Sequence, residues 1–341
     1  MKRIITLVIM ALLLSFSSCQ NDPNKDDNPG PNPISNPNPG PAGSLSKIAD
    51  HSVINKLRSG LITATAINDA KCMLHIGYGH TSHGSQLTDG MRGLIAFAGG
   101  QGCSGAYSGI NGLFDFNRTA AEGVLHLLEG DGYGSGDLDH DCGYYPAWVD
   151  ETRAFLGNPD EATGRGTDHP EFNVIIWSWC GQVSWKNEQQ ITSEYLGPMT
   201  RLEEDYPGIS FVYMTGHLDG SGKGGDLHLR NEQIREYCLE NDKWLFDFAD
   251  IETYGPDGVD YGNFFPTDGC VYDYNNNGSS EKTGDTTPVN GDRNWAADWQ
   301  DSHTQDVDWY SCGSQHSLPL NANMKAYAAW WLWCRLAGWE G

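Results

Sequence analysis

Four short apolar runs, separated by stretches with helical periodicity, restrict the folds that this chain can adopt. The runs span residues 72–78, 172–179, 209–215 and 244–248. The second and third are near-continuous and rich in β-branched and aromatic side chains, as is typical of strands buried on both faces of a parallel sheet. Helices are expected at 191–205, 229–241 and 321–336. Strand alternating with helix predicts a three-layer α/β/α fold with a mostly parallel sheet.

Polar and glycine residues follow every one of the four runs. Because the carboxyl ends of parallel strands share one edge, where α/β proteins form their sites, these residues are expected to meet. Two long inserts, 99–168 and 254–310, interrupt the alternation and are expected to be loops with short helices. The segments after the four runs are 79–84, 180–182, 216–219 and 250–252.

Ser82 and His316 carry the strongest chemical signal in these segments. Ser82 lies in a turn bounded by Gly79 and Gly84. Such a turn can expose a nucleophilic hydroxyl beside backbone N–H groups that hold an oxyanion. His316 immediately precedes the last predicted helix, and a histidine there can act as a general base near neutral pH. The alternatives are a helix-capping serine and a surface or capping histidine.

This layout resembles the SGNH (GDSL-type) hydrolase superfamily in the order of its elements from about residue 72 to residue 336. Ser82 takes the place of the serine after the first strand, and His316 that of the histidine before the last helix. Gln182 lies where the family has its Asn-bearing turn. The letters differ, because no G-D-S is present and Gly313 stands where the family has its acid.

The resemblance implies a flavodoxin-like sheet and an esterase mechanism. Ser82 would attack an ester carbonyl, His316 would accept its proton, and Asp308 or Asp306 would orient the imidazole unless the pair acts as a dyad. The implied substrates are acylated glycans, which would be deacylated without a cofactor. The residues expected to hold the oxyanion or the substrate are Gly84, Gly181, Gln182, His80 and His217.

A separate segment has the pattern of a calcium loop. Asp273, Asn275 and Asn277 precede a glycine at the spacing of an EF-hand start, and Glu281 occupies the ninth position. Gly284 replaces the usual twelfth-position glutamate. We therefore expect a structural Ca²⁺ site rather than a complete EF-hand, and the alternative is a plain Asn/Gly turn.

The histidines also permit a metal-dependent hydrolase, in which zinc activates water. No H-E-x-x-H or similar spacing supports it, and His75, inside an apolar run, is expected to be a core residue. The candidate ligands are His75, His80, His83, His217, His316 and Asp219.

A third possibility is a calcium-stabilised carbohydrate-binding protein with a decayed hydrolase site. Trp295, Trp299 and Trp309 lie in an acidic, Asn-rich stretch and would offer their ring faces to sugars. The alternative is that they pack the insert onto the core. Coplanar exposed indoles would favour the binding protein. Buried indoles, together with Ser82 and His316 within hydrogen-bond reach of each other, would favour the enzyme.

The N-terminus predicts secretion and a lipid anchor. Residues 1–18 combine basic residues, an apolar run too short to span a bilayer and small residues before Cys19, as in a bacterial lipoprotein signal peptide. Residues 19–44 are an Asn/Pro/Gly-rich tether and 45–341 the α/β domain. Acidic residues after Cys19 resemble surface-export signals, so an outer-membrane lipoprotein at the cell surface is expected, held only by its lipid.

Charge and cysteine content fit that location. The formal net charge is −24, which argues against a nucleic-acid partner. Eight cysteines besides Cys19 permit disulfides in an oxidising compartment. The pairs Cys103–Cys142 and Cys270–Cys312 are favoured because each flanks part of an insert. Cys72 and Cys334, in apolar stretches, are expected to be buried thiols.

Overall fold

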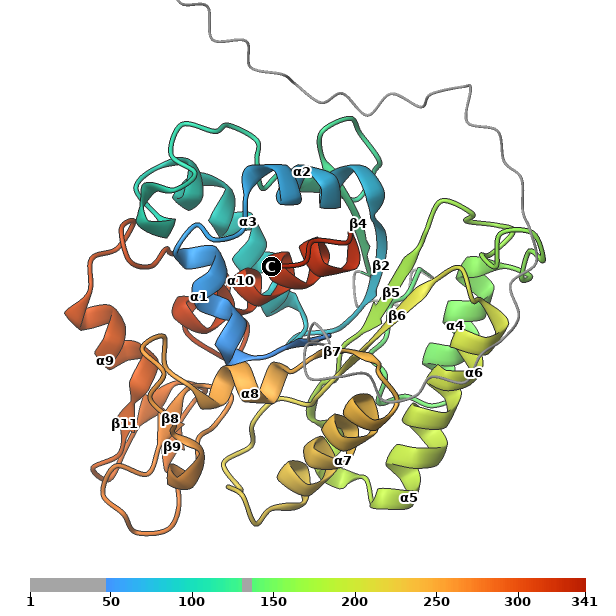
Figure 1. The fold of residues 1–341 in the computed structure, drawn as a ribbon. Helices are drawn as coiled ribbons and strands as arrows, with labels where there is room; N and C mark the ends of the chain where they lie inside the picture. Colours follow the sequence, from blue (N-terminus) through green and yellow to red (C-terminus); the bar gives the residue numbers. More distant parts are fainter. Residues whose placement is uncertain (1–46, 131–136) are drawn as a thin grey trace, which may run out of the picture. The chain divides into compact units, whose positions relative to one another are not determined.

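The computed structural model describes residues 47–130 and 137–341 (Figure 1). The predicted signal peptide, Cys19 and the tether lie outside the described residues. Within these two ranges, no helix is both long enough and apolar enough to cross a bilayer.

A central sheet of seven parallel strands organises the domain, as the alternating pattern predicted. Its order is β1-β7-β6-β5-β2-β4-β3. Helices cover both faces of the sheet, so the structure confirms the three-layer α/β/α fold (Figure 1). The strands are β1 (Ile48–Ala49), β2 (His75–Gly79), β3 (Phe116–Asn117), β4 (Leu125–Glu129), β5 (Val174–Trp177), β6 (Ser210–Met214) and β7 (Trp244–Phe246).

The strand order fixes where a site can form. Without the two edge strands, the order β4-β2-β5-β6-β7 is the flavodoxin-like arrangement, whose switch point lies between β2 and β5. Gly79 pairs with Trp177 across these two strands. Ser82 and Cys180 each follow three residues after that pair, so the register itself brings them side by side beyond the sheet edge.

The helices divide between the two faces of the sheet (Figure 1). One face carries α1 (Ile54–Arg58), α2 (Ala64–Met73), α3 (Ser85–Gly99) and α10 (Pro319–Leu336). The other carries α4 (Ala147–Leu156), α5 (Glu188–Ile191), α6 (Gly197–Asp205) and α7 (Asp226–Glu240). The predicted helix at 191–205 is a composite, because a π-helical turn at Thr192–Leu196 joins α5 to α6.

Helix α10 is the centre of the first helical layer. It begins with Pro319 at its first turn, where the missing proline N–H costs nothing. Its indoles point into the core, and Trp330, Trp331 and Trp333 are each at most 2% exposed. Because α1, α2 and α3 all pack against it, α10 is apolar nearly all round rather than along one stripe.

The prediction that residues 99–168 form only loops and short helices is wrong, because this insert contributes strands to the sheet. Residues 99–168 contain β4, which pairs with β2, as well as β3 and α4. The second insert holds two short antiparallel pairs and the helix α9 (Trp295–Ser302). The two pairs join β8 (Val271–Tyr272) to β11 (Arg293–Asn294) and β9 (Lys282–Thr283) to β10 (Thr287–Pro288).

Both favoured disulfides are wrong. Cys103, Cys142, Cys270 and Cys312 are free thiols in the structure. Cys142 Sγ is buried and donates to the carbonyl oxygen of Ser178 at 2.9 Å. Flanking an insert in sequence does not bring two Cβ atoms within disulfide reach. Cys334 is the buried thiol that was expected, whereas Cys72 is exposed on the last turn of α2.

Candidate active site

The turn after β2 leads directly into α3 and needs glycine at its last position. A Cβ atom on Gly84 would lie 2.4 Å from both His80 Cβ and Ser178 Oγ. Among the described residues, the backbone N–H groups of Ser82, His83 and Gly84 have no hydrogen-bond acceptor. They precede the 15-residue helix α3, whose dipole places positive potential at the same point. An anionic group at this turn would therefore be stabilised by these N–H groups and by the helix dipole.

Cys180 lies opposite this turn, where β5 ends. Its backbone N–H donates to Gln182 Oε1 at 3.0 Å, which fixes the turn that follows. Its Sγ atom lies 3.2 Å from His83 Nδ1 and 3.5 Å from Ser82 Oγ. The thiol thus contacts two of the polar side chains that follow β2, those of Ser82 and His83.

His83 links Cys180 to a carboxylate on the other side of its ring. His83 Nε2 lies 3.1 Å from Asp268 Oδ2, and Lys282 Nζ donates to the other oxygen of that carboxylate at 2.6 Å. The imidazole is 6% exposed. A thiol, an imidazole and a carboxylate therefore lie in one continuous chain of contacts. Catalytic triads use the same order of groups.

The electrostatics of this chain favour a charge-separated pair. Burial opposes ionisation of the Cys180 thiol, yet hydrogen bonds from His83 and Ser82 bring its pKa down to about 7. Burial likewise opposes protonation of His83, but its bonds to Asp268 and Cys180 raise its pKa to about 9. Against its burial, His83 and Lys282 hold the pKa of Asp268 well below its ordinary value. The two shifts favour a thiolate beside an imidazolium between about pH 7 and about pH 9.

Two further imidazoles sandwich His83. The ring of His217 stacks on one side at a centroid distance of 3.7 Å, and that of His316 on the other at 4.5 Å. Burial and the neighbouring His83 lower the pKa of His217, so its ring is neutral. Its Nδ1–H donates to the carbonyl oxygen of Leu218, and its buried Nε2 lone pair has no partner in the described part of the chain. That lone pair is free to accept a hydrogen bond from a ligand or a water molecule.

The predicted partners Ser82 and His316 lie in one cluster but make different hydrogen bonds. Ser82 Oγ contacts Cys180, whereas His316 Nδ1 lies 3.3 Å from Asp285 Oδ2. His316 has a φ of 64°, a left-handed conformation that is uncommon outside glycine and often marks functional positions. Their role as nucleophile and base stays a prediction.

Other predicted site residues are placed away from these roles. Asp308 accepts from the backbone N–H of Thr304, so the carboxylate beside His316 is Asp285 instead. His80 Nε2 lies 3.3 Å from Glu129 Oε2 on the β4 side. Gln182 uses its carbonyl oxygen to hold the Cys180 turn. Gly181 follows Cys180 directly, and a Cβ atom on it would approach His217 Nε2 at 3.8 Å.

The zinc interpretation meets a geometric obstacle. His83, His217 and Asp268 offer ligand atoms that all lie within 4.8 Å of one another. However, the two imidazole planes are 6° apart and stacked, so their in-plane lone pairs run parallel. One ion cannot lie in both ring planes at about 2.0–2.1 Å from each nitrogen. As arranged, these residues do not fit a shared metal, and His75 bonds His126 within the sheet instead.

The predicted calcium loop is closed by its own hydrogen bonds. Asp273 accepts from the backbone N–H groups of Asn277 and Gly278 at 3.0 and 2.8 Å. The Asn277 amide donates to both oxygens of Glu281, and Asn275 Oδ1 accepts from the Asn277 backbone. These oxygens gather around one turn but are occupied by N–H donors. Calcium binding here stays a prediction.

The prediction that Trp295, Trp299 and Trp309 form an exposed platform for sugars is wrong. Trp295 is 1% and Trp299 9% exposed, and Trp299 Nε1 donates to Asp257 inside the insert. Trp295 and Trp299 pack the second insert onto the domain, and Trp309 is half-buried. The enzyme interpretation also required Ser82 and His316 to be within hydrogen-bond reach of each other, whereas their side chains contact Cys180 and Asp285.

Sequence reasoning missed the central roles in this cluster. His83 was considered only as a zinc ligand, Cys180 only as part of a turn, and Asp268 not at all. The adjacency of His83 to Ser82 and the placement of Cys180 at a strand end were usable signals. Asp268 had none, because it lies 185 residues from His83 within the second insert.

Comparison of the chain with protein-family models, curated proteins and solved structures gives no match. The site itself therefore carries the functional argument.

Proposed function

We propose that this chain is a hydrolase that cleaves ester bonds through a covalent intermediate on Cys180. The observation that carries the proposal is the unbroken chain of contacts from Cys180 through His83 to Asp268. Burying three polar or charged side chains costs folding free energy, and apolar residues in their places would stabilise the fold better. A cluster of this kind is therefore a candidate for a functional site.

The reaction follows from the positions of the groups. The Cys180 thiolate attacks the ester carbonyl carbon, and the resulting oxyanion lies against the free N–H groups at the start of α3. The imidazolium of His83 gives its proton to the leaving alcohol oxygen as the carbon–oxygen bond breaks. Water then attacks the thioester, His83 takes one of its protons, and the acid leaves as the thiolate re-forms. Asp268 stabilises the charged imidazole throughout.

Ser82 is the second candidate nucleophile, and one observation favours it. Its hydroxyl lies 3.5 Å from the Cys180 sulfur and borders the same N–H groups. A serine hydrolase of the SGNH type, with His316 and Asp285 as base and acid, would use this position. With Cys180 as nucleophile, the Ser82 hydroxyl instead donates to the thiolate and stabilises it.

The N-terminal segment supports an extracellular setting for this activity. A lipoprotein signal peptide with Cys19 as the anchor would place the domain outside the cell, in the bacterial envelope, where acylated glycans are available substrates. Reduced thiols persist poorly in oxidising compartments, so Cys180 as nucleophile makes a low-pKa, oxidation-sensitive enzyme.

Chemical labelling distinguishes the two nucleophiles. The purified full-length chain would be treated at pH 7 with iodoacetamide and, separately, with a fluorophosphonate, and adducts mapped by mass spectrometry. Cys312→Ala is the matched control, because Cys312 is also only partly buried but burial raises the pKa of its thiol to about 12. We expect rapid alkylation at Cys180 that persists in the control and is lost in Cys180→Ala.

The outcomes are separable. Fluorophosphonate labelling of Ser82, with Cys180 inert in the folded chain, would transfer the role to Ser82. Cleavage of p-nitrophenyl acetate that survives both Cys180→Ala and Ser82→Ala would overturn the proposal.

A further inference from the structure

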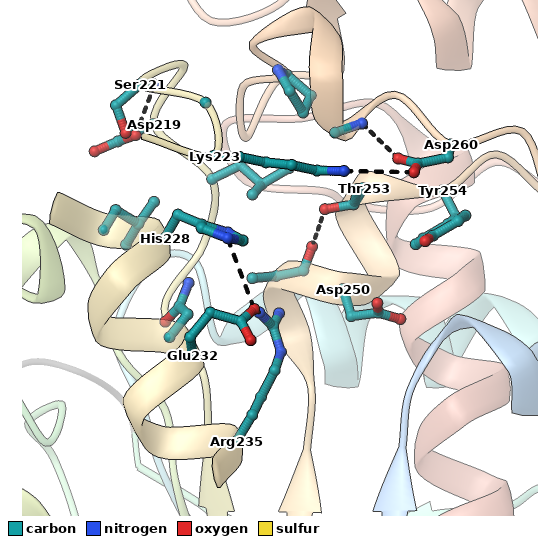
Figure 2. A pocket seen from close by; sticks show the side chains of 17 residues that line it. Asp219, Ser221, Lys223, His228, Glu232, Arg235, Asp250, Thr253, Tyr254 and Asp260 are labelled. Atoms are coloured by element: carbon teal, nitrogen blue, oxygen red, sulfur yellow. Dashed lines mark hydrogen bonds and ion pairs between the residues drawn. The ribbon is translucent and has the colours of Figure 1, made fainter. Parts of the chain in front are cut away.

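The proposed chemistry leaves one cavity of the domain unused (Figure 2). It measures about 340 Å³ and lies between α7, α8 (Phe248–Thr253) and the loop that follows β6. Small-molecule sites start at about 300 Å³, so this cavity is large enough for one or two sugar-sized rings. Its lining begins at Leu218, the residue that follows His217.

One pair of segments forms the wall between this cavity and the cluster. His217 stacks on His83, while the next residue, Leu218, lines the cavity. On the facing segment Asp268 bonds His83, while Pro266 lines the cavity. The backbone N–H of Asp268 donates to the carbonyl oxygen of Leu218 at 3.0 Å, which ties the two segments together. A ligand in the cavity would therefore lie directly behind the residues that hold His83.

The polar groups of the cavity alternate in sign. Lys223 extends across it to within 3.7 Å of Asp260, and His228 points to Glu232 at 3.8 Å (Figure 2). These four side chains remain 33–48% exposed, so each keeps hydrogen-bonding capacity for a ligand. The phenol of Tyr254 closes another side, with its ring stacked on His51.

The charged side chains that line the cavity disfavour anionic and apolar ligands. The lining includes four carboxylates, those of Asp219, Glu232, Asp250 and Asp260, against the two permanent cations Lys223 and Arg235. Arg235 is already bonded to Asp247 and to Glu232, Asp250 is paired with His51, and burial lowers the pKa of His228. The remaining carboxylates, Asp219 and Asp260, outnumber the remaining cation Lys223, so the lining disfavours anions. An apolar ligand would displace water from these charges without replacing its hydrogen bonds.

A hydroxyl group can donate a hydrogen bond to a carboxylate and accept one from an ammonium group, so hydroxyl groups suit both the acidic and the basic side chains of this lining. We infer that this cavity binds a neutral, hydroxyl-rich saccharide unit at a site of its own, behind the segments that hold His83. Binding of the saccharide does not depend on the proposed hydrolase reaction and can be measured without it.

Binding is tested by isothermal titration of Cys180→Ala, which removes turnover, with neutral disaccharides (xylobiose, chitobiose and mannobiose) and with digalacturonate as the anionic analogue. We expect a Kd on the order of 1 mM for at least one neutral sugar and no heat for digalacturonate. Adding Asp260→Asn or Lys223→Ala should weaken binding about tenfold, by loss of a charge-assisted hydrogen bond. Asn at 260 keeps the oxygen that accepts from the Gly262 backbone, so the loop retains its fold. Asp205→Asn is the matched control, an exposed paired carboxylate on α6.

Each result bears on one of the two proposals. Sugar binding that Asp260→Asn and Lys223→Ala weaken, without labelling of either Cys180 or Ser82, would support the saccharide site and contradict the hydrolase. Cleavage of p-nitrophenyl acetate that is lost in Cys180→Ala, with no sugar bound, would support the hydrolase and contradict the saccharide site. Binding that all three variants leave equally strong would also place the sugar elsewhere and overturn the inference.

Discussion

His83 Nδ1 lies 3.2 Å from Cys180 Sγ, and the two residues come from the ends of the neighbouring strands β2 and β5. The contact spans the switch point of the sheet, where parallel α/β folds bind their ligands. Because the opposite nitrogen of the same ring faces Asp268, the contact is part of a relay rather than an isolated thiol–imidazole pair. The following predictions test the consequences of this relationship and of the packing around it.

The rate of Cys180 alkylation should depend on pH through the thiolate. Because the Cys180 pKa lies near 7 and not at its ordinary 9, the rate with iodoacetamide should rise with an inflection near pH 7. Ester hydrolysis should then fall as His83 loses its proton near pH 9, which gives a bell-shaped profile. His83→Gln should move the alkylation inflection upward by at least about one pH unit, since the lowering hydrogen bond is lost. An inflection that stays near 7 in that variant would contradict the pairing.

Asp268→Asn should lower kcat/KM far more than it lowers stability. An orienting carboxylate that holds the catalytic histidine is worth roughly 10³- to 10⁴-fold in rate. Lys282→Ala should cost about tenfold, because it only supports that carboxylate across a partly exposed contact. Steady-state kinetics with p-nitrophenyl acetate, alongside urea unfolding of each variant, checks the order of the two effects. Equal losses from both substitutions would mean that Asp268 does not act on His83.

A buried ion pair beneath the site should be essential to the fold. Lys325 and Glu252 are both fully buried and lie 2.8 Å apart, and Glu252 also accepts from the Leu218 backbone. Lys325→Met would leave a buried carboxylate unpaired, at a cost of about 3–5 kcal/mol in the free energy of unfolding. The double variant Lys325→Met/Glu252→Gln should recover part of that loss, because no charge is stranded. Urea denaturation measures both, and a double variant less stable than the single one would contradict this account.

The thiols should titrate as free cysteines. In chain unfolded without reductant, Cys103, Cys142, Cys270 and Cys312 should all take a first alkylating label, because none is in a disulfide. Peptide mapping after reduction with a second, isotopically distinct label reports any bonded cysteine. Appearance of the second label on Cys103 with Cys142, or on Cys270 with Cys312, would restore the pairs that the insert positions suggested.

The spacing of apolar runs predicted four of the seven strands, β2, β5, β6 and β7, and the helices that follow β5 and β6. Buried strands such as β5 and β6 are read directly from continuous β-branched and aromatic residues, and α7 and α10 from their periodicity and length. The strand β4 was missed because Leu125–Glu129 lies in a Gly-rich stretch whose five residues are too few to stand out. The helical segment after β5 was found, but its π-helical turn has no sequence signature.

What the sequence determined by itself is which side chains reach the carboxyl edge of the sheet, since that follows from where each strand ends. Ser82, Cys180 and His217 were placed there because each follows a predicted strand, and His316 because it precedes the last predicted helix. Only the tertiary structure decided which of them touch. His83 meets Cys180 across 97 residues and Asp268 across 185, and such partners are chosen by strand register and by how an insert folds back over the edge. Hydrogen bonds depend on differences of a few tenths of an ångström, which no local pattern of residues encodes.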